Sequence, residues 1–275
     1  MKLREIFRFE FLYQAHRVRT WLCFAILFVV GFQLMRTSGG NGGALATSPY
    51  DIAIDTVLCN LLWVLLASAV AGSAASRDVQ TRMSPLVYTT PISNADYIAG
   101  RFLAAFALNA LILLMVPAGM LLAVLLQGAE PGTLSPFRPA SYLSAYFILA
   151  LPTAFTVSAI QFSVAVLNRR AVMSYVGSVF LVIVLSIIAG VTINLLQMLT
   201  LGRLLDPIGY ITVIGVMQRI WTPIEKSTLL IGLQGWMLAN KVLWIGISTA
   251  PATPAASPAA SPAASEPAAP APSPS

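Results

Sequence analysis

The chain has 275 residues, of which 57% are hydrophobic and 9% are charged, with a formal net charge of +6. Because roughly a quarter of the residues in an ordinary soluble domain are charged, this composition excludes a soluble globular protein and indicates a membrane protein. The basic residues lie beside apolar runs, so they are expected to set orientation in a membrane, and no nucleic-acid partner is expected.

The first 19 residues have the pattern of an amphipathic helix. Its apolar side consists of Leu3, Ile6, Phe7, Phe9 and Phe11. Its charged side consists of Arg4, Glu5, Arg8 and Arg19. We expect residues 1–19 to form an interfacial helix in the headgroup plane, not a cleaved signal peptide, because no small-residue cleavage site follows. The pattern fits an anchor that only sets orientation as well as it fits a helix that docks a partner.

Five apolar runs follow this segment. They predict membrane spans at residues 20–35, 56–76, 102–126, 142–167 and 171–199. The first run is sixteen residues long, whereas a hydrocarbon core requires about 20. The side chains of Arg19 and Arg36 can make up this difference by reaching the interface. In the second run Ala67, Ala71 and Ala75 recur every four residues, which predicts close packing in the middle of the bundle.

Polar side chains inside the runs have a structural and a functional interpretation. Asn109 and Gln161 fit helix contacts better than a substrate-lining role, because amides in spans usually bond to neighbouring helices. Asp51 and Asp55 stand one helical turn apart, a spacing that paired catalytic acids can have. They precede a span at the outer interface, where a carboxylate costs little, so we expect them to be favourable charges at a helix N-terminus.

Lys and Arg residues are distributed unevenly between alternate loops. The amino-terminal segment holds five, the loop after the second span three, and the loop after the fourth span two. The two intervening loops hold one each, Arg36 and Arg138. Because positively charged short loops stay in the cytoplasm, we expect a multi-pass protein of the inner (plasma) membrane with a cytoplasmic amino terminus.

One long polar segment of the chain, residues 77–101, separates the second and third runs, and we call this segment the central passage. It contains Arg77, Asp78 and Arg82, two prolines, and Arg101 at the mouth of the next run. Its 25 residues exceed what a plain hairpin needs, and its composition is too apolar for a freely solvated loop. We expect it to lie on the cytoplasmic membrane face and to bind a partner. The alternative is that it only solvates that face.

The pattern changes after residue 199. Residues 200–235 mix Gly, Pro and charges at intervals too short for a span, and we expect them outside the membrane as an interfacial helix over 207–221 and a turn at Thr222-Pro223. A partial sixth span is predicted at 236–250. The Ala/Pro/Ser-rich residues 251–275 are expected to form an extended disordered tail.

Several catalytic and binding signatures are absent from the sequence. There is no G-x-x-x-x-G-K-[ST], and the Lys226-Ser227 pair lacks a glycine cradle, so ATP would have to be hydrolysed by a partner. There is no H-E-x-x-H, and the single histidine, His16, is expected among headgroups and not on a metal. Cys23 and Cys59 lie in apolar runs and predict no disulfide. We therefore expect no enzyme activity and no catalytic, cofactor-binding or metal-binding residues.

The chain resembles the permease subunits of type-2 ABC exporters. The resemblance covers residues 1–248 and rests on REIFRFEFLYQAHRVRTWLCFAILF, SRDVQTRMSPLVYTTPISNADYIAGRFLAAF and LLDPIGYITVIGVMQRIWTPIEKSTLLIGLQGWMLANKVLWIG. It is closest in pattern to the branch in which the membrane part can precede an M1-type aminopeptidase domain. It implies six spans with both ends cytoplasmic, an interfacial elbow helix over residues 3–17, and a pairing of two permease chains as a homodimer or heterodimer. This chain departs from the family pattern in its short sixth span and its tail.

The resemblance also implies that residues 77–101 form a coupling loop that fits a cleft on a separate ABC ATPase subunit. Movement of the ATPase on ATP binding would then pull the helices joined to this loop. In this interpretation Arg77, Asp78 and Arg82 dock by charge. The apolar cleft would be filled by Leu86, Val87 and Tyr88. The alternative function is a non-transporting membrane anchor or scaffold for a partner enzyme such as a peptidase, which the short sixth span favours.

Overall fold

The structure, a computed structural model, describes residues 2–38, 47–80, 94–126, 137–168, 170, 172–217, 220–232 and 235–249. Across these ranges the regular structure is helical and contains no β-strand. The predicted all-α fold class is therefore confirmed. The predicted tail, residues 251–275, lies outside the described residues.

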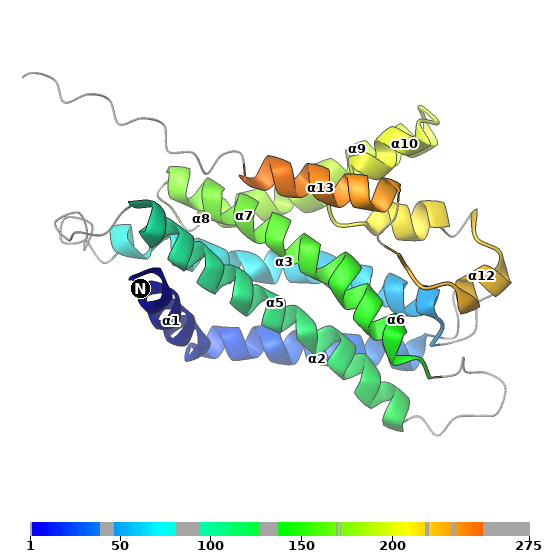
Figure 1. Ribbon diagram of the computed structural model, residues 1–275, viewed down its shortest axis with the longest axis horizontal. Helices are drawn as coiled ribbons and strands as arrows, with labels where there is room; N and C mark the ends of the chain where they lie inside the picture. Colours follow the sequence, from blue (N-terminus) through cyan, green and yellow to red (C-terminus); the bar gives the residue numbers. More distant parts are fainter. Residues whose placement is uncertain are drawn as a thin grey trace, which may run out of the picture.

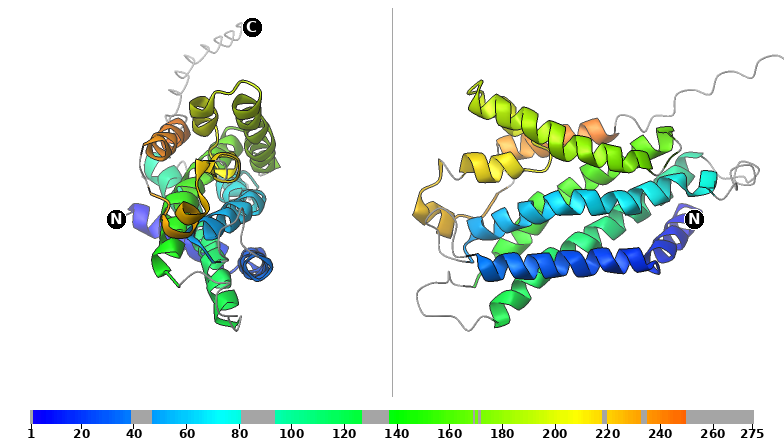
Figure 2. Two further views of the ribbon diagram at one scale, coloured as in Figure 1. Left: turned by 90° about the vertical axis from the view of Figure 1, so that its right-hand side faces the viewer. Right: turned by 180° about the vertical axis from the view of Figure 1, so that it is seen from behind.

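Long helices lying side by side form the bundle (Figure 1). The amino-terminal half contains α1(Lys2–Ala15), α2(Val18–Thr37), α3(Pro49–Gln80) and α5(Asn94–Leu126). A continuous helix follows, made of α6(Pro139–Ser144), the π-helical segment η2(Ala145–Ala150) and α7(Leu151–Asn168). The next consists of α8(Val172–Val179), η3(Phe180–Val184) and α9(Leu185–Asn194). Seen from behind, α2, α3 and the α8–α9 helix follow one another across one side of the bundle (Figure 2).

Five of the described helices are long and apolar enough to cross a membrane. They occupy Val18–Thr37, Pro49–Ala75, Ala95–Leu126, Pro139–Asn168 and Val172–Asn194. Each overlaps one of the five predicted spans. The fully buried side chains of Leu27, Trp63 and Leu113 join α2, α3 and α5 in one apolar core. The chain is thus a multi-pass membrane bundle.

Helices α3 and α5 extend well beyond their predicted spans. Helix α3 has 32 residues and α5 has 33, so each is about 50 Å long at 1.5 Å per residue, whereas a hydrocarbon core is about 30 Å thick. The expected loop over residues 77–101 is therefore helical at both ends, over 77–80 and 94–101. Two rigid helices lead from the membrane into the central passage.

Buried amides join neighbouring helices, as the sequence predicts. Asn109 Nδ2 of α5 donates to Ser158 Oγ of α7 at 2.9 Å. Gln161 Nε2 of α7 donates to the Val64 carbonyl of α3 at 2.8 Å and to Ser178 Oγ of α8 at 2.7 Å. Such bonds fix helix positions in an apolar medium, where each is worth about 0.6 kcal/mol on average. They give these side chains a structural role.

The segment after α9 differs from the prediction. A single interfacial helix was expected over residues 207–221, but the structure has α10(Leu199–Leu204), the π-helical η4(Ile211–Met217) and α12(Pro223–Thr228). The expected turn at Thr222-Pro223 is the start of α12. Thr222 caps this helix, because its hydroxyl accepts from the Glu225 N–H while the Glu225 carboxylate accepts from the Thr222 N–H.

Helix α13(Trp236–Thr249) covers the predicted partial sixth span. With 14 residues it is about 21 Å long and too short to cross a bilayer by itself. It packs against α7 and α10 and is drawn in orange in Figure 1. It runs from the side of the bundle where α12 lies toward the end where α1 lies.

Candidate functional site

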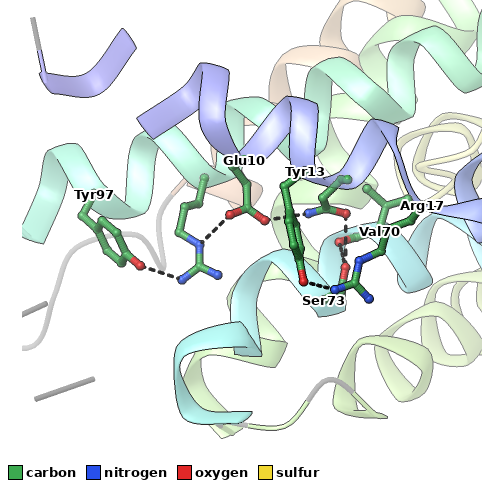
Figure 3. A network of polar contacts seen from close by, with 8 residues as sticks. Glu10, Tyr13, Arg17, Val70, Ser73 and Tyr97 are labelled. Carbon is green, nitrogen blue, oxygen red and sulfur yellow. Dashed lines mark hydrogen bonds and ion pairs between the residues drawn. The ribbon is translucent and has the colours of Figure 1, made fainter. Parts of the chain in front are cut away.

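Helix α1, the end of α3 and the start of α5 lie at one end of the bundle (Figure 1). Polar side chains connect these three helices there (Figure 3). The α1 backbone approaches α5 closely at Gly100, which is buried. A Cβ atom at this position would lie 2.9 Å from Ile6 Cγ2 and 3.3 Å from the Leu3 carbonyl oxygen. Because glycine has no Cβ, the amino-terminal helix can lie directly against the first turns of α5.

A buried ion pair connects the two helices at this junction. Arg101 Nε lies 3.7 Å from Glu10 Oε2, and the two side chains are 4% and 2% exposed. The guanidinium also donates to Tyr97 Oη at 3.1 Å and lies 5.3 Å from the centre of the Tyr97 ring. Removing one partner of a buried ion pair is strongly destabilising, because the other charge then stays buried without a compensating charge. The pair therefore fixes α1 to α5.

Gln14 extends the same network to α3. Its Nε2 donates to Glu10 Oε1 at 3.1 Å, and its Oε1 accepts from Ser73 Oγ at 3.1 Å. At the end of α1, the hydroxyl of Thr20 donates to the Gln14 backbone carbonyl at 2.7 Å. Helix α1 is thus bonded both to α3, which precedes the central passage, and to α5, which follows it.

The elbow residues singled out in the sequence lie on the opposite side of α1. Arg4, Glu5 and Arg8 are exposed, while Ile6 is partly covered by the bundle. One apolar residue departs from the expected pattern, because Phe9 is 61% exposed. The sequence pattern predicted the two-sided helix but not Glu10 and Gln14, which are polar and buried. The sequence feature that could have indicated this pair is the spacing of Glu10 and Gln14, which is one helical turn.

Most of the predicted docking residues lie outside the described part of the chain. Arg77 and Asp78 belong to the last turns of the α3 backbone, and their side chains are not among the described ones. The remaining docking residues, Arg82, Leu86, Val87 and Tyr88, fall in the undescribed segment 81–93. Arg101, expected at the edge of the loop, is instead buried inside α5.

The two aspartates at the opposite end of the bundle are buried inside the protein. Asp51 is 0% and Asp55 is 3% exposed. Asp51 Oδ2 accepts from Ser38 Oγ at 2.6 Å, and its backbone N–H donates to Ser48 Oγ at 3.2 Å. Asp51 does lie in the first turn of α3, as expected. Among the described residues no group of three His, Cys, Asp or Glu side chains could hold a metal ion.

Helix α13 is fixed by hydrogen bonds to the last turn of α10 and to Asp206 just after it. Asn240 Nδ2 lies 2.8 Å from the Arg203 carbonyl oxygen and 3.1 Å from those of Leu204 and Asp206. Trp244 Nε1 donates to the Leu204 carbonyl at 2.8 Å. Burial raises the pKa of the Asp206 carboxyl, and hydrogen bonds from backbone N–H groups oppose that shift.

Replacing Asn240 by alanine should lower the free energy of unfolding by about 1–3 kcal/mol, because buried carbonyl groups lose their donor. Unfolding of the purified chain in mixed micelles measures this change. Leu238→Ala on the exposed side of the same helix is the matched control, and it should change stability by less than about 0.5 kcal/mol. Equal effects of the two substitutions would show that α13 is held by apolar packing alone.

The described fold defines a polytopic membrane protein whose amino-terminal helix is bonded to the two helices that flank its central passage. Residues 6–190, more than half of the chain, match the sequence profile of a family described as ABC-2 family transporter protein. The chain therefore belongs to this family, and the resemblance to ABC-2 permease subunits is confirmed. Comparison with curated proteins gives no match. The family consists of membrane components of transporters and implies an ABC ATPase partner. The link to aminopeptidase domains stays a prediction.

Proposed function

We propose that the chain is the permease subunit of an ABC exporter that couples ATP hydrolysis by a separate ATPase subunit to outward transport. The observation that carries this proposal is the junction of α1, α3 and α5. A force applied to the central passage would act on two helices of about 50 Å. It would also act on α1, because the Glu10–Arg101 pair and the Gln14–Ser73 bond hold α1 to both.

The orientation follows from the charges at the two ends of the bundle. Helix α1, the last turn of α3, the first turn of α5 and the α7–α8 connection lie at the same end (Figure 1). These are the segments in which the sequence concentrates Lys and Arg, which supports the proposal that this end faces the cytoplasm of a cell with an inner (plasma) membrane. An ATPase in the cytoplasm could then reach residues 77–93.

A second permease chain completes the proposed transporter. The continuous helix made of α8, η3 and α9 carries exposed apolar side chains, among them Tyr175, Phe180 and Ile187. A single bundle of this size is filled by its own side chains, so a pathway between two copies or two related chains is proposed. The substrate would cross the membrane at that interface.

The double substitution Arg77→Glu with Arg82→Glu should weaken association with the ATPase at least about tenfold, because reversing charged contacts at an interface costs about 2 kcal/mol or more. Co-purification of the tagged permease with its ATPase measures this loss. The matched control is Arg36→Glu with Arg138→Glu, which makes the same change of net charge at the opposite end and should leave association intact. Unchanged association in the first variant would contradict the docking assignment. Capture of a soluble peptidase without any ATPase would favour the anchor function instead.

A further inference from the structure

The outer side of α1 carries a groove at the point where the interfacial helix turns into the first span. The groove has a volume of about 470 Å³ and is lined by Phe9, Leu12, Tyr13, His16 and Arg17. Phe9, Leu12 and Tyr13 are exposed, and they make its floor apolar. Because α2 begins at Val18 and is long enough to span a membrane, the groove lies at the depth of lipid headgroups.

The charged end of the groove is built around Arg17. Its guanidinium donates to Tyr13 Oη and lies 4.5 Å from the centre of the Tyr13 ring. Both of these contacts orient the side chain, and no carboxylate among the described residues forms an ion pair with it. A phosphate group would be a strong partner for this guanidinium, because Arg forms charge-assisted bonds to phosphate oxygens.

Two further features favour an anion at this position. Arg17 is the N-cap residue of α2, which has neither a side-chain cap nor an acidic residue in its first turn. The positive end of the helix dipole is therefore not offset locally by a carboxylate of α2. His16 Nδ1 donates to the Leu12 carbonyl at 2.6 Å, so its Nε2 is left for another partner.

We propose that this groove binds an anionic phospholipid, with the phosphate at Arg17 and an acyl chain along Phe9 and Leu12. The complementarity is twofold, because a cation stands at one end and an apolar surface at the other. The opposite side of the same helix holds the Glu10–Arg101 and Gln14–Ser73 contacts, so a bound lipid would stabilise α1 in the position that joins α3 to α5. The proposal is independent of the ATPase interaction.

Native mass spectrometry of the full chain in neutral detergent, with added phosphatidylglycerol or phosphatidylcholine, tests the site. Phosphatidylglycerol should bind about fivefold more tightly, since one basic residue near an anionic lipid is worth about 1 kcal/mol. Arg17→Gln should remove this preference, and Arg17→Lys should keep it. Arg36→Gln is the matched control, because Arg36 lies over the Phe32 ring at the other end of α2, 5.7 Å from its centre. The Arg36→Gln variant should bind the two lipids with the same affinities as the unchanged chain.

The apolar half of the groove has its own test. Leu12→Ser should weaken the binding of both lipids by a similar factor and leave the ratio of the two affinities unchanged. Equal affinity for the two lipids, or equal losses in Arg17→Gln and Arg36→Gln, would overturn the proposal. Displacement of phosphatidylglycerol by millimolar inorganic phosphate alone would also overturn it, because the groove would then be a site for a free anion. The melting temperature of each variant without added lipid shows that it is folded.

Discussion

Replacing Arg101 by alanine should lower the free energy of unfolding by about 3–5 kcal/mol, the cost of breaking a buried ion pair by removing one partner. The Glu10 carboxylate would remain in a site where it is almost fully buried. The Tyr97 hydroxyl would lose its guanidinium donor as well. Unfolding in mixed micelles, followed by far-ultraviolet circular dichroism, measures this loss.

Two further variants separate charge from packing. Glu10→Leu combined with Arg101→Met should restore stability to within about 1 kcal/mol, because apolar side chains of similar size often replace a buried pair without loss. Arg4→Ala, on the exposed side of α1, should change stability by less than about 0.5 kcal/mol. If Arg101→Ala is no worse than Arg4→Ala, the ion pair does not hold α1 in place.

Gly119→Ala should destabilise the bundle by about 1–3 kcal/mol or more, through overpacking between α2 and α5. A Cβ at Gly119 would lie 2.2 Å from the Phe28 carbonyl oxygen and 2.9 Å from the Phe32 backbone nitrogen. Both contacts involve backbone atoms, so no side chain can rotate away and the two helices have to separate. A Cβ at Gly31 would likewise lie 2.8 Å from the Val116 carbonyl oxygen. The two helices therefore meet backbone to backbone, as small residues allow in membranes.

Gly246→Ala in α13 is the matched control for this substitution. A Cβ at Gly246 has no heavy atom within 4 Å. Since glycine inside a helix costs roughly 0.5–1 kcal/mol relative to alanine, this change should raise stability by about that amount. The same substitution thus has opposite expected signs at two helical positions. A similar loss at both positions would show that the close approach of α2 and α5 is not what makes Gly119→Ala costly.

The sequence predicts the membrane bundle well, because long apolar runs admit few alternatives in a bilayer. The first predicted span, residues 20–35, lies within α2, and the fourth lies within the continuous α6–α7 helix. The limits of α3 and α5 were not predicted from the apolar runs. Past the hydrocarbon core a helix no longer needs apolar residues, so it can continue through a polar stretch of sequence. Helix ends outside the membrane are set by local contacts instead.

The buried polar contacts could not be predicted from the sequence. Glu10 and Arg101 are 91 residues apart, and no local spacing indicates that they pair. Arg101 was interpreted as a loop cation for this reason, although it is buried against α1. In contrast, the start of α12 could have been predicted from the sequence, since Thr222 and Glu225 have the spacing of a capping box. The proline between them was interpreted as a turn instead.

Thiol labelling at position 78 tests most directly whether the central passage faces the cytoplasm, where an ATPase could bind it. The two native cysteines are buried, so Asp78→Cys can be labelled selectively. A membrane-impermeant maleimide should react with Asp78→Cys only after the membrane is opened, whereas Ile224→Cys on the exposed surface of α12 should react in intact cells. Labelling of Asp78→Cys in intact cells would contradict the proposed orientation and, with it, the coupling to an ATPase.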